Sequence, residues 1–235
     1  MRNIKIKIFA DGADFAGIVN FNKKNFIKGL TTNPTLMKKS GIKNYSKFAK
    51  KILKIVKKKP ISFEVFSDDF EGMYAQAIKI ASWGKNVYVK IPVTNTKGKG
   101  SYNLIKRLSE KNIKLNVTAI FTEDQIKKVI NSLNPNAKSI ISIFAGRIAD
   151  TGRNPEFFVK KALSLLSNNK NCEVLWASTR ELYNIVTADK IGCHIITVPN
   201  AILEKINLFE YDLTNYSLET VKEFYRDANK AGFKI

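Results

Sequence analysis

Short apolar runs alternate with amphipathic segments along the whole chain. The runs are five or six residues long and rich in β-branched residues, and the segments between them carry apolar residues at helical spacing. Strands that are buried on both faces and separated by helices are typical of parallel βαβ units with right-handed crossovers. Eight strands are predicted, over residues 6–10, 27–32, 61–66, 86–91, 113–118, 139–144, 173–178 and 194–198.

The segments between these runs contain helix signals. Thr122 and Gln125 form a capping box, in which the two side chains satisfy backbone N–H groups at a helix start. Asn154 followed by Pro155 predicts another start, and residues 47–59 place lysines around an amphipathic helix. Two further apolar stripes consist of Phe70, Met73, Ala77, Ile80 and Ala81, and of Leu218, Val221, Phe224, Tyr225 and Ala228.

This order of elements predicts an α/β protein with a closed (β/α)8 TIM barrel. The chain has 235 residues, close to the length of about 250 that is typical of this fold. An open doubly wound sheet is the alternative, but no G-x-G-x-x-G follows any predicted strand. We expect residues 1–235 to form one domain. An additional C-terminal helix, over about 217–231, is expected to cap the barrel or to dock on a neighbouring subunit.

The net charge of +20 is mainly due to lysine, because only 6 of the 40 basic residues are arginine. Basic surfaces attract nucleic acids, acidic membranes and anionic metabolites. Here the lysines are dispersed over predicted helix faces, and no basic motif is interleaved with aromatic residues, so a catalytically inactive, nucleic-acid-binding barrel is the weaker alternative. Arg147, Arg153 and Arg180 follow predicted strands, where bidentate recognition of an anion would place them.

The remaining composition restricts the chemistry. Cys172 and Cys193 form no CxxC or Cys/His cluster, and His194 is the only histidine, so a zinc site or a histidine-based triad is not indicated. The chain has no apolar stretch near the roughly 18 residues of a membrane span, and its N-terminal residues resemble no signal peptide. We therefore expect a cytoplasmic protein that uses carboxylate, lysine, hydroxyl and amide groups.

Lys90 lies within the apolar run NVYVKIPVT (86–94), where an unpaired ammonium group is costly to bury. Nearly every predicted strand carries a polar residue near its C-terminal end, and a closed barrel brings these ends to one mouth, where active sites of this fold lie. The residues concerned are Asp11, Asn33, Glu64, Lys90, Asn116, Thr118, Ser142, Ser178 and Arg180.

Side-chain alternation indicates which of these residues share a face. Asn116 and Thr118 are expected to point into the barrel together, as are Ser142 and Phe144. Trp176, Ser178 and Arg180 are expected to share the interior face of the seventh strand. A lysine amine among carboxylates suits imine catalysis, because a neutral amine attacks a carbonyl and carboxylates transfer the protons. Alternatively, Lys90 extends to solvent or merely pairs with Glu64.

Six segments resemble, in order, the motifs of the transaldolase family of class I aldolases. The likeness runs from Asp11 to about Pro199, some four-fifths of the chain. The TTNPT and VKIP segments together, at this spacing, are highly specific. The matching segments are LTTNPTLM (30–37), FEVF (63–66), VYVKIPVT (87–94), LNVTAIF (115–121), SIFAGRIADTG (142–152) and WASTRELYNI (176–185).

The resemblance implies a role for each matched residue. Lys90 corresponds to the lysine that forms a Schiff base with the ketose, and Asp11 to the acid/base that takes the proton of the hydroxyl at the departing carbon. Glu64 corresponds to a carboxylate that acts through a water shared with Thr118. No metal or organic cofactor is implied. The substrate-binding positions are Asn33 and Asn116 for the dihydroxyacetone unit, Ser142 and Phe144 in the same pocket, and Arg147, Ser178 and Arg180 for the sugar phosphate.

Several of these residues also have an ordinary structural explanation. Asp11 could cap the next helix, and Asn33 with Pro34 is a common turn. Ser178 could cap a helix, and Arg147 could pair with Asp150. These explanations do not account for the whole set in this order.

The implied activity is that of a transaldolase, which moves dihydroxyacetone from fructose 6-phosphate or sedoheptulose 7-phosphate to an aldose phosphate in the pentose phosphate pathway. The alternatives are a fructose 6-phosphate-type aldolase and a transaldolase for an unusual sugar. Glu64 and Phe144 favour the transferase branch, because aldolases of the family tend to have Gln and Tyr there. Two residues depart from the family pattern: Gly12 stands where Thr or Ser often follows the Asp, and Ile143 replaces a Pro found in many members. These departures bear on which sugar is used and not on the imine chemistry. Small family members often form rings through the C-terminal helix, so a homo-oligomer is expected.

Overall fold

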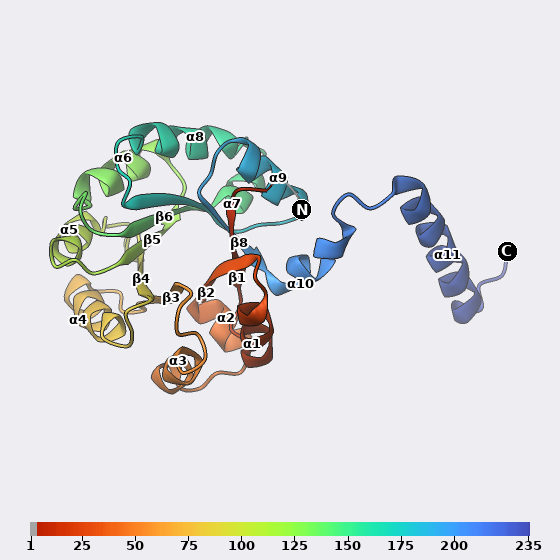
Figure 1. Ribbon diagram of the computed structural model, residues 1–235, viewed down its shortest axis with the longest axis horizontal. Coiled ribbons are helices and arrows are strands. Elements are labelled where there is room, and N and C mark those ends of the chain that lie inside the picture. Colours follow the sequence, from red (N-terminus) through yellow and green to blue (C-terminus); the bar gives the residue numbers. More distant parts are fainter. Residues whose placement is uncertain (1–3) are drawn as a thin grey trace.

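The computed structural model, which describes residues 4–235, is a closed barrel of eight parallel strands surrounded by helices (Figure 1). Each strand pairs with the next along the chain, and β8 pairs with β1, so the predicted (β/α)8 architecture is confirmed. The strands are β1 (Lys7–Asp11), β2 (Ile27–Thr31), β3 (Ile61–Glu64), β4 (Val87–Pro92), β5 (Leu115–Ile120), β6 (Ser139–Ile143), β7 (Cys172–Trp176) and β8 (Ile195–Pro199).

Helices follow the strands, and all except the last, α11, lie around the barrel. They are α1 (Phe15–Lys23), α2 (Pro34–Lys39), α3 (Tyr45–Leu53), α4 (Phe70–Ala81), α5 (Tyr102–Glu110), α6 (Glu123–Ser132), α7 (Ala145–Ala149), α8 (Glu156–Leu165), α9 (Tyr183–Lys190), α10 (Asn200–Leu203), the 3₁₀ helix η1 (Glu204–Leu208) and α11 (Leu213–Ala231). The capping box of Thr122 and Gln125 opens α6 as predicted. Asn154 Oδ1 accepts a hydrogen bond from Glu156 N at the start of α8.

Two helix predictions are corrected by the structure. The helix expected over 47–59 ends at Leu53, and turns over residues 54–59, in which Val56 is buried, connect it to Pro60. The C-terminal helix begins at Leu213 instead of about 217, where Asp212 accepts a hydrogen bond from Asn215 N as its cap. The short helix α7 was not among the predicted elements.

Apolar side chains form two cores, one on each side of the strand barrel. The inner cluster consists of Phe9, Ile140, Leu175, Ala177 and Ile195, with Tyr88 and Phe144 packed against it. The larger outer cluster fills the space between strands and helices. Trp176 belongs to this outer cluster, so the prediction that it faces the barrel interior was wrong. Alternation on β7 is therefore offset by one residue from the expected pattern, with Leu175 and Ala177 pointing inward.

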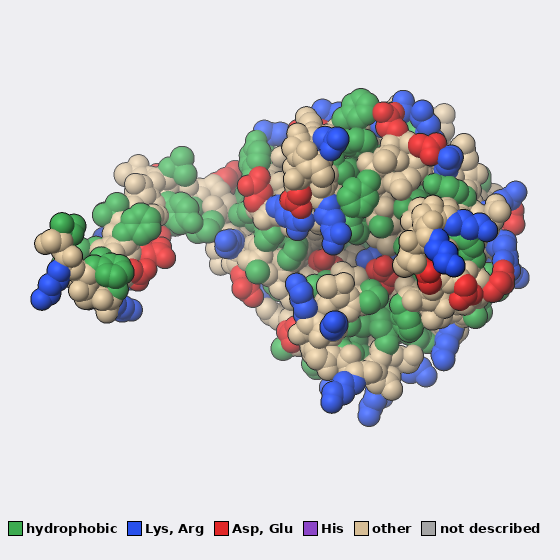
Figure 2. All heavy atoms as spheres, turned by 180° about the vertical axis from the view of Figure 1, so that it is seen from behind, with side chains coloured by type: hydrophobic (Ala, Val, Ile, Leu, Met, Phe, Trp, Pro, Cys, Tyr) green, Lys and Arg blue, Asp and Glu red, His purple; other side chains and the backbone are tan. Residues whose placement is uncertain are grey.

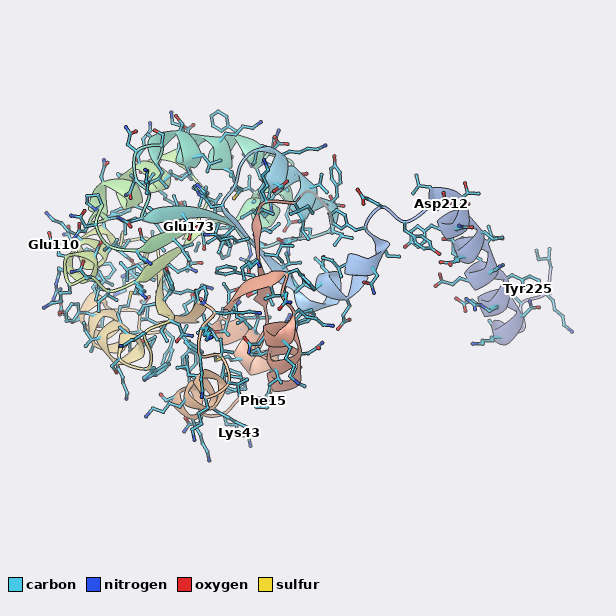
Figure 3. All side chains as sticks on the ribbon, in the orientation of Figure 1. Phe15, Lys43, Glu110, Glu173, Asp212 and Tyr225 are labelled. Atoms are coloured by element: carbon cyan, nitrogen blue, oxygen red, sulfur yellow. The ribbon has the colours of Figure 1, made fainter. Side chains whose placement is uncertain are left out.

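The helix α11 projects away from the barrel, connected to it by α10 and η1 (Figure 1). None of its residues is buried, and Phe224 and Tyr225 are 67% and 72% exposed. Figure 3 shows Asp212 at the start of this helix and Tyr225 along it, both at a distance from the barrel. From the opposite side, Lys and Arg side chains are scattered over the barrel, while apolar side chains gather on the projecting helix (Figure 2). Within residues 4–235, every helix is too short or too polar to cross a bilayer.

Candidate active site

Lys90 is buried inside the barrel, next to a carboxylate. Its neighbours Val89 and Ile91 belong to the outer core, whereas Tyr88 packs on the inner cluster, so alternation directs Lys90 inward. The residue is only 7% exposed. Its Nζ lies 3.1 Å from Glu64 Oε2 and donates a hydrogen bond to the Thr32 carbonyl at 3.2 Å. The carboxylate is therefore in position to accept a proton from the amine.

Strand register explains why these groups meet. Glu64 on β3 is the direct neighbour of Lys90 on β4, and Lys90 is the direct neighbour of Asn116 on β5. Neighbouring residues in parallel strands direct their side chains to the same face. An acid, an amine and an amide thus form one row across three strands.

Asp11, the last residue of β1, is the second carboxylate of the site. It accepts a hydrogen bond from Thr31 Oγ1 at 2.7 Å, and Thr31 also contacts the Thr197 hydroxyl on β8. Burial raises the pKa of Asp11, and the nearby positive charge of Lys90 opposes that rise. A carboxyl with a raised pKa exchanges a proton more readily near neutral pH, which is the property required of a general acid/base. Asp11 and Lys90 thus lie close enough to interact electrostatically.

The interior of the barrel beside Lys90 is lined by a hydrogen-bonded chain of amide and hydroxyl groups. Asn116 Nδ2 donates to Ser62 Oγ at 3.1 Å, and Ser142 Oγ donates to Asn116 Oδ1 at 2.7 Å. All three residues are buried. These bonds fix the orientation of the Asn116 amide, with its polar atoms inside the barrel. The structure therefore brings Asn116 and Ser142 together beside Lys90.

Thr118 is buried on β5 beside these hydrogen-bonded groups. Its Oγ1 makes no hydrogen bond to any residue that the structure describes. A buried hydroxyl without a partner is costly and is uncommon in folded proteins. The next residue, Ala119, has φ of 59°, in the left-handed region, and the β5–β6 register shifts between Val117 and Ile120. This bulge ends the regular ladder directly after Thr118.

Asn33 and Phe144 lie at the ends of β2 and β6. Asn33 Oδ1 accepts a hydrogen bond from Leu36 N at 2.9 Å and so caps α2, a structural role that adds to the turn expected of Asn33 with Pro34. Its Nδ2 atom takes no part in that cap. Phe144 packs on the inner core and on Phe121, with ring centroids 5.6 Å apart. The Arg147 guanidinium lies 5.7 Å from the Phe144 ring centroid, which links this ring to the adjacent basic region.

The basic region is built from the loops after β6 and β7. Gly146 N donates to Ala177 O at 3.2 Å, and a Cβ at this glycine would lie only 1.6 Å from Ser178 O. Only glycine therefore lets α7, with Arg147, approach the β7 loop so closely. Ser178 itself has φ of 64° and makes no helix cap. This close approach brings the loop carrying Arg147 against the loop carrying Ser178 and Arg180.

Arg180 is exposed and forms a bidentate ion pair with Asp150. Its Nε donates to Asp150 Oδ1 at 3.1 Å, and its Nη2 donates to Asp150 Oδ2. The Arg180 guanidinium holds the pKa of the Asp150 carboxyl below its ordinary value, and Arg147 adds to this effect. Asp150 thus pairs with Arg180. The structural explanation of Arg147, in which Arg147 pairs with Asp150, was wrong. A cavity of about 290 Å³ beside this pair is lined by Trp176, Arg180 and Tyr183, but not by Asp11, Glu64 or Lys90.

Sequence patterns did not indicate several polar residues around Lys90. They are Thr31, Thr32, Tyr45, Ser62 and Thr197. Ser62 and Thr197 lie within strands and alternate with apolar residues, which is the signal by which they could have been found. Thr32 takes part through its backbone carbonyl, and Tyr45 lies on α3, so neither strand pattern nor spacing could reveal them.

Comparison with known proteins places the chain in a family. A sequence model described as transaldolase/fructose-6-phosphate aldolase matches residues 8–235. The chain belongs to this family. The family was expected from the motifs around Asn33, Lys90 and Arg147, and the match confirms that expectation.

Curated relatives of this transaldolase-family chain cover nearly all of it. A probable transaldolase of Thermoanaerobacter sp. (strain X514) is 35% identical over 231 residues, which are 98% of this chain and 100% of that protein. A probable transaldolase of Methanococcus maripaludis (strain C7 / ATCC BAA-1331) is 34% identical over 91% of this chain and 94% of that protein. These relatives confirm the prediction of a transaldolase enzyme.

A solved structure confirms the fold. The crystal structure of KGPDC from Streptococcus mutans has a TM-score of 0.57 and 11% sequence identity, and the match covers 87% of this chain and 92% of that one. A second crystal structure of the same protein, determined as a complex, has a TM-score of 0.55 and 11% identity, covering 84% of this chain and 88% of that one. At this identity the likeness concerns the barrel alone.

Proposed function

We propose that this transaldolase-family enzyme transfers a dihydroxyacetone unit from a ketose phosphate to an aldose phosphate through a Schiff base on Lys90. The proposed donors are fructose 6-phosphate and sedoheptulose 7-phosphate. The single observation that carries the proposal is the position of Lys90 Nζ, which is buried inside the barrel and lies 3.1 Å from a Glu64 carboxylate oxygen. Burial of Lys90 excludes the alternative in which its ammonium group extends to solvent. A purely structural pair with Glu64 would account for the ion pair alone, whereas the second carboxylate, Asp11, and the neighbouring amide of Asn116 supply the further groups that imine catalysis requires.

The first step is attack of the Lys90 amine on the ketose carbonyl. Glu64 accepts the ammonium proton and returns it to the carbinolamine hydroxyl, which leaves as water when the imine forms. Thr118 assists, because its buried Oγ1 has no hydrogen-bond partner among residues 4–235 and can hold the water that Glu64 activates for imine hydrolysis. The positive imine nitrogen then serves as the electron sink for cleavage.

The second step is retro-aldol cleavage. The Asp11 carboxylate takes the proton of the hydroxyl on the departing carbon, the carbon–carbon bond breaks, and its electron pair moves to the imine to form an enamine. The aldehyde leaves, and addition of the enamine to an acceptor aldehyde returns the proton from Asp11. Asn33 Nδ2 and the Asn116 amide, with Ser142, bind the hydroxyls of the three-carbon unit meanwhile.

The phosphate is bound at the other end of the mouth. Arg147 lies on α7, and Ser178 and Arg180 lie on the loop after β7, and the contact between Gly146 and Ser178 holds these two elements together. Arg180 uses its Nε and one Nη2 proton to bind Asp150, and its remaining guanidinium protons are available to an anion. The charge of +20 draws sugar phosphates toward this mouth.

A specific observation favours transfer over simple aldol cleavage. Releasing dihydroxyacetone requires a proton donor for the enamine, and Phe144 has no hydroxyl to supply one. The test is to incubate the enzyme with fructose 6-phosphate, with and without erythrose 4-phosphate, and to measure both transfer product and free dihydroxyacetone. We expect rapid transfer and slow release. Release of free dihydroxyacetone without the acceptor, at a rate equal to that of transfer, would instead establish an aldolase.

We further propose that residues 1–235 form one domain that assembles into a homo-oligomer through α11. The apolar residues Leu218, Val221, Phe224 and Tyr225 are all at least half exposed on this helix, which leaves its own barrel. Residues 200–235 contain six acidic and five basic side chains, so they can approach a second, strongly basic barrel without repulsion. Light scattering should show a multimer, and Phe224→Glu should dissociate it. A monomeric native enzyme would refute the assembly.

A further inference from the structure

The hydroxyl of Tyr45 contacts the backbone of Glu64 twice. Glu64 N donates a hydrogen bond to Tyr45 Oη at 2.7 Å, and Tyr45 Oη donates one to Glu64 O at 2.9 Å. One side-chain oxygen on α3 therefore satisfies both main-chain groups of the residue whose carboxylate lies 3.1 Å from Lys90 Nζ.

This contact replaces two missing bonds of the β2–β3 ladder. The pairing of β2 with β3 ends with Thr31 and Ser62, followed by a bond from Thr32 N to Ser62 O at 3.2 Å. A continued parallel ladder would join Glu64 N to the Thr32 carbonyl and the N–H of residue 34 to Glu64 O. Residue 34 is proline and has no N–H.

The Thr32 carbonyl has another partner. It accepts a hydrogen bond from Lys90 Nζ at 3.2 Å, so it is turned toward the proposed nucleophile. Tyr45 supplies the acceptor that Glu64 N–H would otherwise find at Thr32. The ladder can therefore open at this point without leaving a partly buried backbone group unpaired, and the Thr32 carbonyl remains available to orient the Lys90 amine.

Tyr45 has the properties that this position requires. A phenol both donates and accepts, which matches the two opposite backbone groups. Burial, together with the charge of Glu64, raises the pKa of Tyr45, so the hydroxyl keeps its proton throughout the working range of the enzyme. Three aromatic side chains hold the ring in place, with centroid distances of 6.4 Å to Phe63, 5.4 Å to Phe66 and 6.1 Å to Trp83.

We propose that Tyr45 is a positioning residue of the imine steps, which holds Glu64 against Lys90 by closing the gap between β2 and β3. This inference rests on the proposed Schiff-base function. Without the hydroxyl, Glu64 N–H would turn toward the Thr32 carbonyl, its natural ladder partner, and the carboxylate and the carbonyl would both shift relative to the amine.

The test is Tyr45→Phe, which keeps the ring in its aromatic cluster and removes only the oxygen. The rate of imine formation, measured by rapid mixing with fructose 6-phosphate followed by borohydride quench, should fall about tenfold, because small displacements of reacting groups have effects of this size. The inhibition constant of inorganic phosphate should not change, because Arg147 and Arg180 lie on other loops. The matched control is Tyr74→Phe on α4, for which we expect native rates.

A double-mutant cycle separates positioning from general destabilisation. If Tyr45 acts through Glu64, removing its hydroxyl in a Glu64→Gln background should slow imine formation by no more than about twofold. A tenfold effect in both backgrounds, or a native rate in Tyr45→Phe, would overturn the positioning role. If the native enzyme forms no imine at all, the proposed function itself fails, and this outcome is distinct from both.

Discussion

The two ends of the barrel mouth are built differently. Lys90, Asn116, Thr118 and Ser142 are buried on strands, and their positions follow from the register of β4, β5 and β6. Arg147 and Arg180 are exposed and lie on α7 and on the loop after β7. The proposed reacting groups are thus fixed by the sheet itself, whereas the proposed phosphate ligands lie outside the sheet, on α7 and on the loop after β7.

This difference separates rate from affinity. Buried groups on a rigid sheet are oriented before the substrate arrives, and such preorganisation lowers the barrier of the chemical steps. Exposed guanidinium groups are hydrated and screened by salt, and they contribute mainly to binding. Mutations at the two ends should therefore change different kinetic constants.

The largest effect is expected at the buried end from Lys90→Met. Methionine has a similar length but no amine, so transfer should fall by roughly 10⁴- to 10⁶-fold, as expected when a covalent nucleophile is removed. Steady-state transfer from fructose 6-phosphate to erythrose 4-phosphate measures this. A loss of less than tenfold would show that the amine does not form the intermediate.

A smaller but still large loss is expected from Asp11→Asn. The amide cannot accept the hydroxyl proton, and kcat should fall by roughly 10²- to 10⁴-fold, the contribution of a positioned acid/base. Imine formation should persist, because Glu64 and Lys90 are unchanged. Borohydride reduction of the variant with fructose 6-phosphate measures the imine. Native amounts of reduced imine together with lost turnover would place Asp11 in the cleavage step, and loss of the reduced imine would place it in imine formation.

At the exposed end, Arg180→Gln should raise the KM for fructose 6-phosphate by about 10- to 100-fold and change kcat little, because one charge-assisted contact with the phosphate is lost. The effect should shrink at high ionic strength. Arg153→Gln is the matched control, since Arg153 is exposed and bonds only to Thr151 within the described residues. Equal changes in both variants would mean that overall charge, and not Arg180, binds the phosphate.

The smallest effect concerns stability. Because the folded-state pKa of Asp11 is raised, the stabilising contribution of this group is present below its ordinary value of 3.8 and is lost as the pH rises through the folded-state value. Asp11→Asn should therefore raise the free energy of unfolding relative to the native enzyme at pH 7, and the gain should disappear near pH 3. Urea unfolding at both pH values measures the difference. If Asp11→Asn were less stable than the native enzyme at pH 7, the pKa of Asp11 would not be raised in the folded state.

The buried end of the mouth, whose residues lie on strands, was more predictable from the sequence than the exposed end. A β-branched run with one lysine predicts the strand that carries Lys90, and parallel strands bring Glu64 and Asn116 beside it. The burial of Lys90 was one of two alternatives that the sequence left open, and the structure decides it. The partner of Asp150 and the inward face of β7 could not be predicted. The partner of Asp150 depends on loop geometry. The face of Trp176 follows from the register of β7 with β6, and it could not be inferred from Ser178 and Arg180, because the left-handed conformation of Ser178 interrupts alternation after the strand.

The role of Tyr45 could not be predicted from the sequence. This residue lies on a helix 19 residues from Glu64, and it acts on backbone atoms that one-dimensional patterns do not describe. Its role follows only from the point at which the β2–β3 ladder stops, which is set by Pro34 and by the contact between Thr32 and Lys90.

The central claim is that Lys90 forms a Schiff base with the donor. Reducing the enzyme with borohydride in the presence of fructose 6-phosphate, followed by peptide mass mapping, tests it directly. The account predicts one modified lysine, at position 90, carrying a reduced three-carbon unit. An unmodified Lys90, or modification spread over the surface lysines, would contradict it.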